Sequence, residues 1–352
     1  MSNDIRIKKG LDIKLKGEAE QVIENAVISN FYIIRPENFH GIIPKMLVKE
    51  GEAVKAGSPL YYSKSNENVK IVSPVSGTLI SLERGEKRRI LSLKIQADKS
   101  QSFLEHGVLN VETASATDIK KHLLNAGCWP FVNQRPYDII ANPEKQPKAI
   151  FVSGFSTAPL TADLDFVLKG KEAELQVALT AFSKLTDGAV HVSIGNTANS
   201  PFKDLKDITL HTVSGPHPAG NVGTQINKIN PVNKGEVVWT INAHDLVIIG
   251  ELLLTGKFNA ERIVAMVGSS VEKPRYFRTK IASEVATMIY DKGIKKDGND
   301  RVISGNVLSG TQIKPDGYLD YYSNVITVIP EGDDYEFFGI SRYSIKYQLL
   351  EL

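Results

Sequence analysis

Cysteine is almost absent from this sequence of 352 residues, in which Cys128 is the only one. A single thiol cannot form an intramolecular disulfide. It also cannot hold an iron–sulfur cluster, which takes four cysteine ligands, or two cysteines and two histidines in the Rieske type. The seven histidines form no HExxH pair, and the spacing of His211 and His217 matches no zinc motif. We therefore expect no metal site in this chain.

Long apolar runs and a strong excess of one charge are also missing. The longest strongly apolar stretch, 246–254, contains Glu251 and is far shorter than the roughly 20 residues of a membrane-spanning helix. The first ten residues, MSNDIRIKKG, lack the apolar core of a signal peptide. The formal net charge of +2 gives no general attraction to nucleic acid. The sequence predicts a cytoplasmic chain with no transmembrane segment, peripheral membrane contact and no nucleic-acid partner.

Residues 1–100 have the pattern of short strands and turns, with strand-like alternation at 12–16 and 91–95. The patterns V-x-x-G-x-x-V-x-x-G-x-x-L at 48–60 and V-x-P-x-x-G-x-L at 72–79 resemble a lipoyl/biotinyl-type barrel-sandwich hybrid domain. A carrier domain has a modified lysine at its hairpin tip. Here Lys64 and Lys70 lack the usual D-K-A or M-K-M context. We favour a structural use of the barrel and keep a lipoyl-type carrier as an alternative.

Alternating strands and helices follow. Apolar strands at 149–153, 190–194 and 208–213, with a helix over 163–186, predict a Rossmann-like α/β domain over 101–255. Strands around one helix, at 279–292, indicate a β-grasp (SLBB-like) domain over 256–330. The remainder, 331–352, reads as a C-terminal arm. The predicted fold class is therefore a multi-domain α/β protein with three domains.

A glycine- and proline-rich loop, SGPHPAGNVGT at 214–224, comes directly after a predicted strand. Such loops can bind phosphate through backbone N–H groups. A P-loop needs Lys-Ser/Thr after its second glycine, but Asn221 and Val222 follow Gly220, and the chain has no G-x-G-x-x-G. We expect a rigid contact surface rather than a nucleotide site. The residues of interest are Gly215, Pro216, His217, Pro218, Gly220 and Gly223.

Several long segments together resemble the NqrA family, the A subunits of the Na⁺-translocating NADH:quinone reductase. They are RIKKGLDIKLKGEAEQ, AGCWPFVNQRPYD, SGPHPAGNVGTQI, INAHDLVIIGELLLTGKF and ERIVAMVGSSVEKPRYFRTKIASEV. The resemblance implies a peripheral, cytoplasm-facing member of a six-subunit complex that passes electrons from NADH to ubiquinone or menaquinone and exports Na⁺. It places NADH oxidation elsewhere in the complex and associates NqrA with quinone. Family members run longer and end in a helical domain, so we expect a C-terminally truncated member.

A more distant resemblance connects the domain order to the flavin-binding subunit of complex I and to the C subunit of the Rnf complex. Those proteins hold FMN in a glycine-rich loop after a helix, beside an acidic motif. The corresponding segment here, 126–137, carries bulky aromatic residues and prolines, and Ser156 and Thr157 replace the acidic residues. This comparison implies a chain without its own flavin, NADH site or catalytic residues, which is inactive in isolation.

The aromatic segment 126–137 is the candidate quinone site. Trp129, Phe131 and Tyr137 could line an apolar slot for the ring, with Arg135 or Tyr137 donating a hydrogen bond to a quinone carbonyl. The alternative is that Trp129 and Phe131 are core residues that fill the vacated flavin site. A different class of function also stays open, namely a module that binds a soluble ligand through the β-grasp loop at 304–310.

Overall fold

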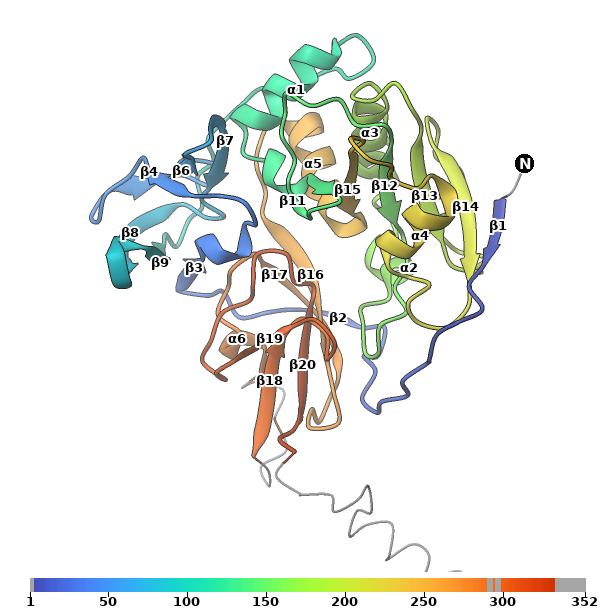
Figure 1. The fold of residues 1–352 in the computed structure, drawn as a ribbon. Helices are drawn as coiled ribbons and strands as arrows, with labels where there is room; N and C mark the ends of the chain where they lie inside the picture. The colour runs from blue at the N-terminus through green and yellow to red at the C-terminus, as the bar shows by residue number, and fades with distance from the viewer. Residues whose placement is uncertain (1–2, 290–293, 295–298, 333–352) are drawn as a thin grey trace, which may run out of the picture.

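The computed structural model describes residues 3–289, 294 and 299–332, and these form three units built on β-sheets (Figure 1). A barrel of two small sheets lies beside a mostly parallel sheet flanked by helices, and a six-stranded mixed sheet lies below both. The predicted fold class, with a barrel-sandwich, a Rossmann-like unit and a β-grasp-like unit, is confirmed. The predicted arm falls almost entirely, from residue 333 onward, outside the described residues.

The barrel consists of a four-stranded sheet in the order β3-β9-β8-β5 and a three-stranded sheet in the order β4-β6-β7. Leu60, Ile71 and Leu93 are fully buried in its core, as expected for apolar side chains on alternate strand positions. At the tip of the β6–β7 hairpin Lys64 is exposed, whereas Lys70 lies half-buried within β7. The elements are β3 (Phe31–Ile34), η1 (Pro36–Asn38), β4 (Pro44–Met46), β5 (Ala53–Val54), β6 (Pro59–Ser63), β7 (Asn66–Val72), β8 (Gly77–Arg84), η2 (Glu86–Arg88) and β9 (Ile90–Ala97).

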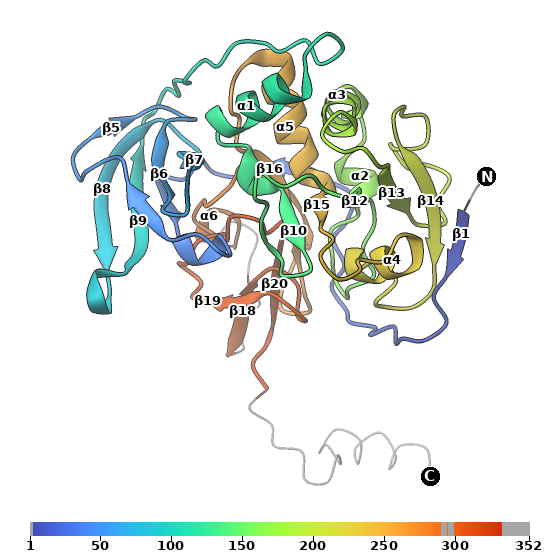
Figure 2. The ribbon, with the colours of Figure 1, turned by 45° about the horizontal axis from the view of Figure 1, so that its top comes forward.

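The central unit is a seven-stranded sheet in the order β1-β14-β13-β12-β15-β10-β11, whose first five strands run parallel. Helix α4 covers one face, and α3 and α5 pack together on the other (Figure 2). The strands are β1 (Asn3–Arg6), β10 (Asn133–Arg135), β11 (Ile139–Ile140), β12 (Ile150–Ser153), β13 (Val190–Ile194), β14 (Thr209–Ser214) and β15 (Val238–Asn242). The helices are α1 (Ala116–Asn125), η3 (Trp129–Phe131), α2 (Leu164–Val167), α3 (Glu172–Ser183), α4 (Val222–Ile229) and α5 (Ala243–Thr255).

The continuous helix predicted over 163–186 is wrong. Asp163 caps a short helix, α2, by accepting hydrogen bonds from the backbone N–H groups of Asp165 and Phe166. The chain then turns at Gly170, which has φ +79°, before α3 begins at Glu172. Glycine adopts this left-handed conformation without the steric cost that a Cβ brings, so it ends one helix and lets the next start.

The third unit is a sheet in the order β19-β18-β20-β16-β17-β2. The helix predicted over 279–292 begins later than expected, because β17 extends through Lys280 and α6 starts only at Ala286. Residues 290–292 of that prediction lie outside the described residues. The elements are β2 (Ile23–Asn25), β16 (Glu261–Val267), β17 (Arg275–Lys280), α6 (Ala286–Ile289), β18 (Asp300–Ser304), β19 (Thr311–Ile313) and β20 (Val325–Pro330).

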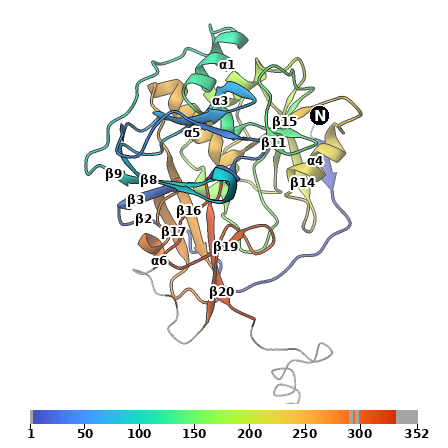
Figure 3. The same ribbon diagram turned by 60° about the vertical axis from the view of Figure 1, so that its left-hand side comes forward.

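The N-terminal segment connects all three units (Figures 1 and 3). Strand β1 pairs with β14 in the central sheet, β2 pairs with β17 in the third sheet, and β3 belongs to the barrel. The strand predicted at 12–16 is not formed. The residues that flank this stretch bond instead to two loops, with Leu11 N–H donating to the His217 carbonyl and Gly268 N–H donating to the Gly17 carbonyl. Alternation alone does not make a strand when no neighbouring strand supplies the ladder.

The three units share one apolar core at their junction. Phe39 of the barrel packs on Tyr321 of the third unit with ring centroids 4.6 Å apart, and Phe131 of the central unit lies 5.6 Å from the same tyrosine ring. Gly127 allows the central unit to approach the barrel, since a Cβ at this position would lie 2.2 Å from a methyl group of Val72. The units therefore form one packed body.

Candidate functional site

A crevice of about 690 Å³ opens at the carboxyl ends of β12 and β15. These strands are neighbours, but the chain leaves β12 toward β13 on one side of the sheet and returns to β15 on the other. In open α/β sheets the crevice at such a switch point is the usual place for a ligand. Ser153 ends β12 and Asn242 ends β15, and both line the opening.

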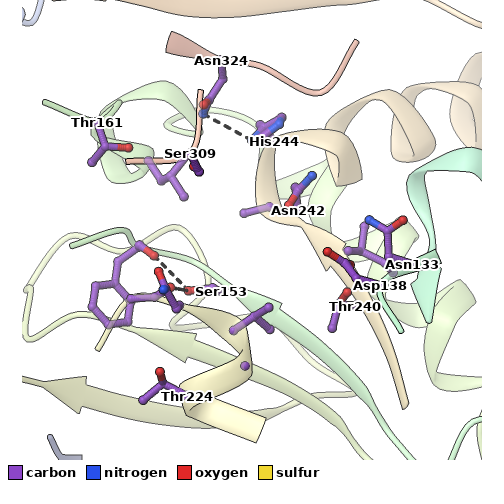
Figure 4. A pocket seen from close by; sticks show the side chains of 18 of the residues that line it. Asn133, Asp138, Ser153, Thr161, Thr224, Thr240, Asn242, His244, Ser309 and Asn324 are labelled. Carbon is purple, nitrogen blue, oxygen red and sulfur yellow. Dashed lines mark hydrogen bonds between the residues drawn. The ribbon is translucent and has the colours of Figure 1, made fainter. Parts of the chain in front are cut away.

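Polar side chains from all parts of the central unit surround this crevice (Figure 4). Asn133 and Arg135 come from β10, and His244 comes from the first turn of α5. The third unit closes one side with Ser309 and Asn324. The remaining lining residues are Asp138, Ser153, Phe155, Thr161, Leu164, Gly220, Asn221, Val222, Gly223, Thr224, Thr240, Ile241, Asn242 and Ala243.

Two helices begin at the crevice, since the first residues of α4 and of α5 line it. The first turn of an α-helix has backbone N–H groups without helical partners, and the aligned peptide dipoles add partial positive charge there. The Arg135 guanidinium adds side-chain donors, and its charge is balanced by the Asp138 carboxylate, which also lines the crevice and lies 3.3 Å from Arg135 Nε. The crevice therefore offers hydrogen-bond donors suited to the acceptor oxygens of a ligand.

The wall beside α4 depends on Gly220. A Cβ at this position would lie 2.5 Å from the backbone nitrogen of Thr157, which is closer than any side chain tolerates. The Gly220 N–H donates to Thr157 Oγ1 at 2.9 Å, and the Ser153 hydroxyl lies 2.9 Å from the Gly220 carbonyl oxygen. Gln225 Nε2 donates to the same hydroxyl. The loop thus holds the start of α4 against the end of β12.

His244 connects the crevice with the buried junction of the units. Asn324 Nδ2 donates to its Nδ1 at 3.3 Å, and burial is the main factor that lowers the His244 pKa to about 4. The ring is therefore neutral near neutral pH. The next residue, Asp245, is fully buried and forms an ion pair with Arg262 of β16. The same arginine donates to the Tyr321 carbonyl at 2.7 Å.

The structure separates the residues of the predicted quinone slot. Trp129 and Phe131 have no exposed surface, and Trp129 Nε1 donates to the Ala141 carbonyl at 2.7 Å. In this structure neither ring lines an open slot. Arg135 lines the crevice, whereas Tyr137 is 80% exposed and is not among the lining residues.

The two halves of the glycine- and proline-rich loop lie in different places. Gly220 and Gly223 line the crevice. His217 Nδ1 lies 3.1 Å from Thr157 Oγ1, and a Cβ at Gly215 would meet the Ile7 carbonyl oxygen at 2.1 Å. Pro216 adjoins Gly10 of the N-terminal segment, and Pro218 follows His217 through a cis peptide bond. This half of the loop packs on that segment.

The sequence motifs do not single out Asn242, His244 or Asn324 as site residues. The end of a strand followed by a helix was a signal for the first two. Which strand ends are neighbours depends on strand order, however, and Asn324 comes from a different unit. Within the described parts of the chain, His, Cys, Asp and Glu side chains do not gather in a group of three that could hold a metal ion. The described helices are too short or too polar to cross a bilayer.

Comparison with known proteins gives consistent matches over almost the whole chain. Residues 5–98 match the family model of the NqrA N-terminal barrel-sandwich hybrid domain, 114–258 the NqrA second alpha/beta domain and 263–314 the NQRA C-terminal domain. The chain is 38% identical over 350 residues to the A subunit of the Na⁺-translocating NADH-quinone reductase from Neisseria meningitidis. It is 35% identical over 351 residues to that from Glaesserella parasuis.

Each of these alignments covers 98% of this chain and 78% of the relative. Among solved structures, an NAD⁺-reducing [NiFe]-hydrogenase matches with a TM-score of 0.42 and 10% identity, over 67% of this chain and 53% of that one. This likeness is too low to establish a shared fold.

Proposed function

The chain belongs to the NqrA family, the A subunits of the Na⁺-translocating NADH-quinone reductase, and we propose that it serves as the peripheral, cytoplasm-facing, quinone-associated component of such a six-subunit complex. The observation that carries the proposal is the 35–38% identity to NqrA proteins over 98% of the chain. The complex would pass electrons from NADH to ubiquinone or menaquinone and export Na⁺. Other subunits would supply the NADH site and the redox cofactors.

The test of this role is purification from native membranes. A tagged chain is expected to bring the other subunits with it, and the purified assembly is expected to reduce quinone with NADH. A chain that consistently purifies alone, although folded, would contradict the proposal. We expect the exposed hairpin lysine, Lys64, to carry no lipoyl or biotinyl group in this role.

We further place the quinone head group in the crevice beside Arg135. Quinone carbonyl oxygens accept hydrogen bonds, and Arg135 and the first turns of α4 and α5 provide donors in the crevice lining. Tyr137 follows Arg135 by two residues and is exposed, and in this proposal its ring closes over the bound quinone. Trp129 and Phe131 act from the core, because η3 leads directly into β10 and so fixes the position of Arg135.

Replacement of Arg135 by glutamine is expected to weaken quinone binding by about 10- to 100-fold, the equivalent of losing a hydrogen bond from a charged donor. The measurement is titration of the chain with a short-chain ubiquinone, followed by quenching of tryptophan fluorescence. Arg84→Gln, an exposed substitution on barrel strand β8, is the matched control. If Arg135→Gln is folded and binds as tightly as Arg84→Gln does, the crevice is not the quinone site.

The purified chain is expected to be colourless and unable to oxidise NADH. The segment that corresponds to the flavin loop of related proteins contains Trp129, Pro130 and Phe131, whose side chains are buried and fill the space there. Pro130 also lacks the backbone N–H that a phosphate could use. The measurements are an absorbance spectrum from about 350 to 500 nm, where a flavin held by its protein site absorbs, and an NADH oxidation assay. A flavin peak near one equivalent would overturn this assignment.

A further inference from the structure

Strand β2 lies at the edge of the third sheet (Figure 3). On one side it pairs in parallel with β17, through bonds that include Tyr276 N–H to the Val22 carbonyl and Ala26 N–H to the Arg278 carbonyl. Because hydrogen bonding alternates along a strand, the backbone groups of Ile23 and Asn25 point to the other side. No strand of the described residues pairs there. An edge of this kind is a template for another extended chain.

Apolar side chains flank this edge. Val22 is 45% exposed, Ile23 37%, Val27 56% and Ile28 79%. A single exposed apolar residue on a protein surface needs no explanation. Four of them within seven residues, next to an unpaired strand edge, form a patch of the kind that marks an interaction site.

A pocket of about 380 Å³ adjoins the patch. Residues 25–29 form one wall, residues 278–280 at the end of β17 form another, and the barrel contributes Tyr32 and residues from 97–101. Its volume is sufficient for a large apolar side chain. A pocket beside an exposed edge is where a partner's anchor residue is held in peptide recognition by strand addition.

The charge at this pocket is incompletely balanced. Arg275 is paired with Glu24, and Arg278 is paired with Glu261. The Lys280 ammonium, which is half-buried, has no carboxylate of the described residues within ion-pair distance and lies 5.8 Å from the Phe103 ring centroid. Burial lowers the Lys280 pKa, against the opposing effect of the Glu261 and Glu251 carboxylates nearby. Exposed Lys99 adds a second cation to the lining, opposed by exposed Asp98, which leaves a net positive charge.

We propose that this surface, defined by Val22, Ile23, Val27, Ile28 and Lys280, binds an extended segment of another polypeptide. The segment adds a strand to the outer edge of β2, inserts an apolar side chain into the pocket and offers a carboxylate to Lys280. The inference rests on the proposed function in one respect, namely that the partner is another subunit of the complex.

The test uses a new cysteine in place of Ile28. The native Cys128 is buried, and burial raises its pKa, so it reacts poorly with maleimides. The thiol introduced by Ile28→Cys is then the reactive one in this chain. Its labelling in the isolated chain is compared with its labelling in the purified complex, by mass spectrometry of this chain. Val108→Cys, at a residue that is 67% exposed and outside this surface, is the control.

We expect the thiol at position 28 to react readily in the isolated chain and to be protected in the complex, while the thiol at position 108 reacts in both. A benzophenone attached at position 28 should crosslink to a polypeptide segment that contains acidic and apolar residues. Equal labelling at position 28 in both states, or crosslinking to lipid alone, would overturn the inference while the proposed function stands. A chain that does not co-purify with other subunits would overturn both.

Discussion

Replacement of Asp245 by alanine is expected to lower the free energy of unfolding by about 3–5 kcal/mol, which is the typical cost of leaving one partner of a buried ion pair without the other. Asp245 has no exposed surface, and the Arg262 side chain is 2% exposed. The carboxylate also accepts a hydrogen bond from Asn242 Nδ2 at 2.9 Å. Without it, the Arg262 guanidinium would remain buried at the contact between α5 and β16.

The measurement is urea unfolding followed by tryptophan fluorescence, which reports on the buried pair of Trp129 and Trp239. Glu105→Ala removes one partner of an exposed ion pair with Lys257 and is expected to cost less than about 1 kcal/mol. The double variant Asp245→Leu with Arg262→Met should recover part of the loss, because no charge then stays buried. A single Asp245→Ala variant as stable as the Glu105→Ala control would show that the pair does not hold the units together.

The fold could be predicted where local sequence and final packing agree. The run at 190–194 is buried from both sides of the sheet, so its apolar character predicts a strand, and β13 has those bounds. The segment at 12–16 has an equally regular alternation but lies on loops with its apolar side chains partly exposed. Pattern alone does not distinguish these cases, because a strand also requires a neighbour, and the neighbour is set by the tertiary structure.

The candidate site could be predicted only in part for a related reason. The segment 126–137 contributes one crevice residue, Arg135, which the sequence proposes as a donor to the quinone, and that role stays a prediction. Its two aromatic rings at Trp129 and Phe131 lie in the core instead, as bulky side chains usually do. The crevice also contains Asn242, His244 and Asn324 beside Arg135, only because β12, β15 and the third unit come together in space. No spacing in the sequence indicates that these residues line one crevice.

Replacement of Trp129 by alanine is expected to cost about 3–5 kcal/mol of unfolding free energy, as for other large-to-small changes of buried aromatic residues. The indole is fully buried, packs edge-on against Trp239 with ring centroids 5.3 Å apart and donates its Nε1 hydrogen to Ala141. Removal leaves a cavity and an unpaired carbonyl group. Trp129→Phe keeps most of the volume but not the donor, so it should lose less.

Thermal and urea unfolding of both variants would measure these losses, with Tyr137→Ala as the matched aromatic control because that ring is 80% exposed and should cost little. Quinone titration of the same proteins then separates the two roles considered for the aromatic segment. Because Trp129 lies in the core, Trp129→Phe should retain quinone affinity while it loses stability. Tyr137→Ala should retain stability and lose quinone affinity. If Trp129→Phe instead keeps its stability and loses quinone affinity, the ring must reach the ligand in a conformation different from the one described.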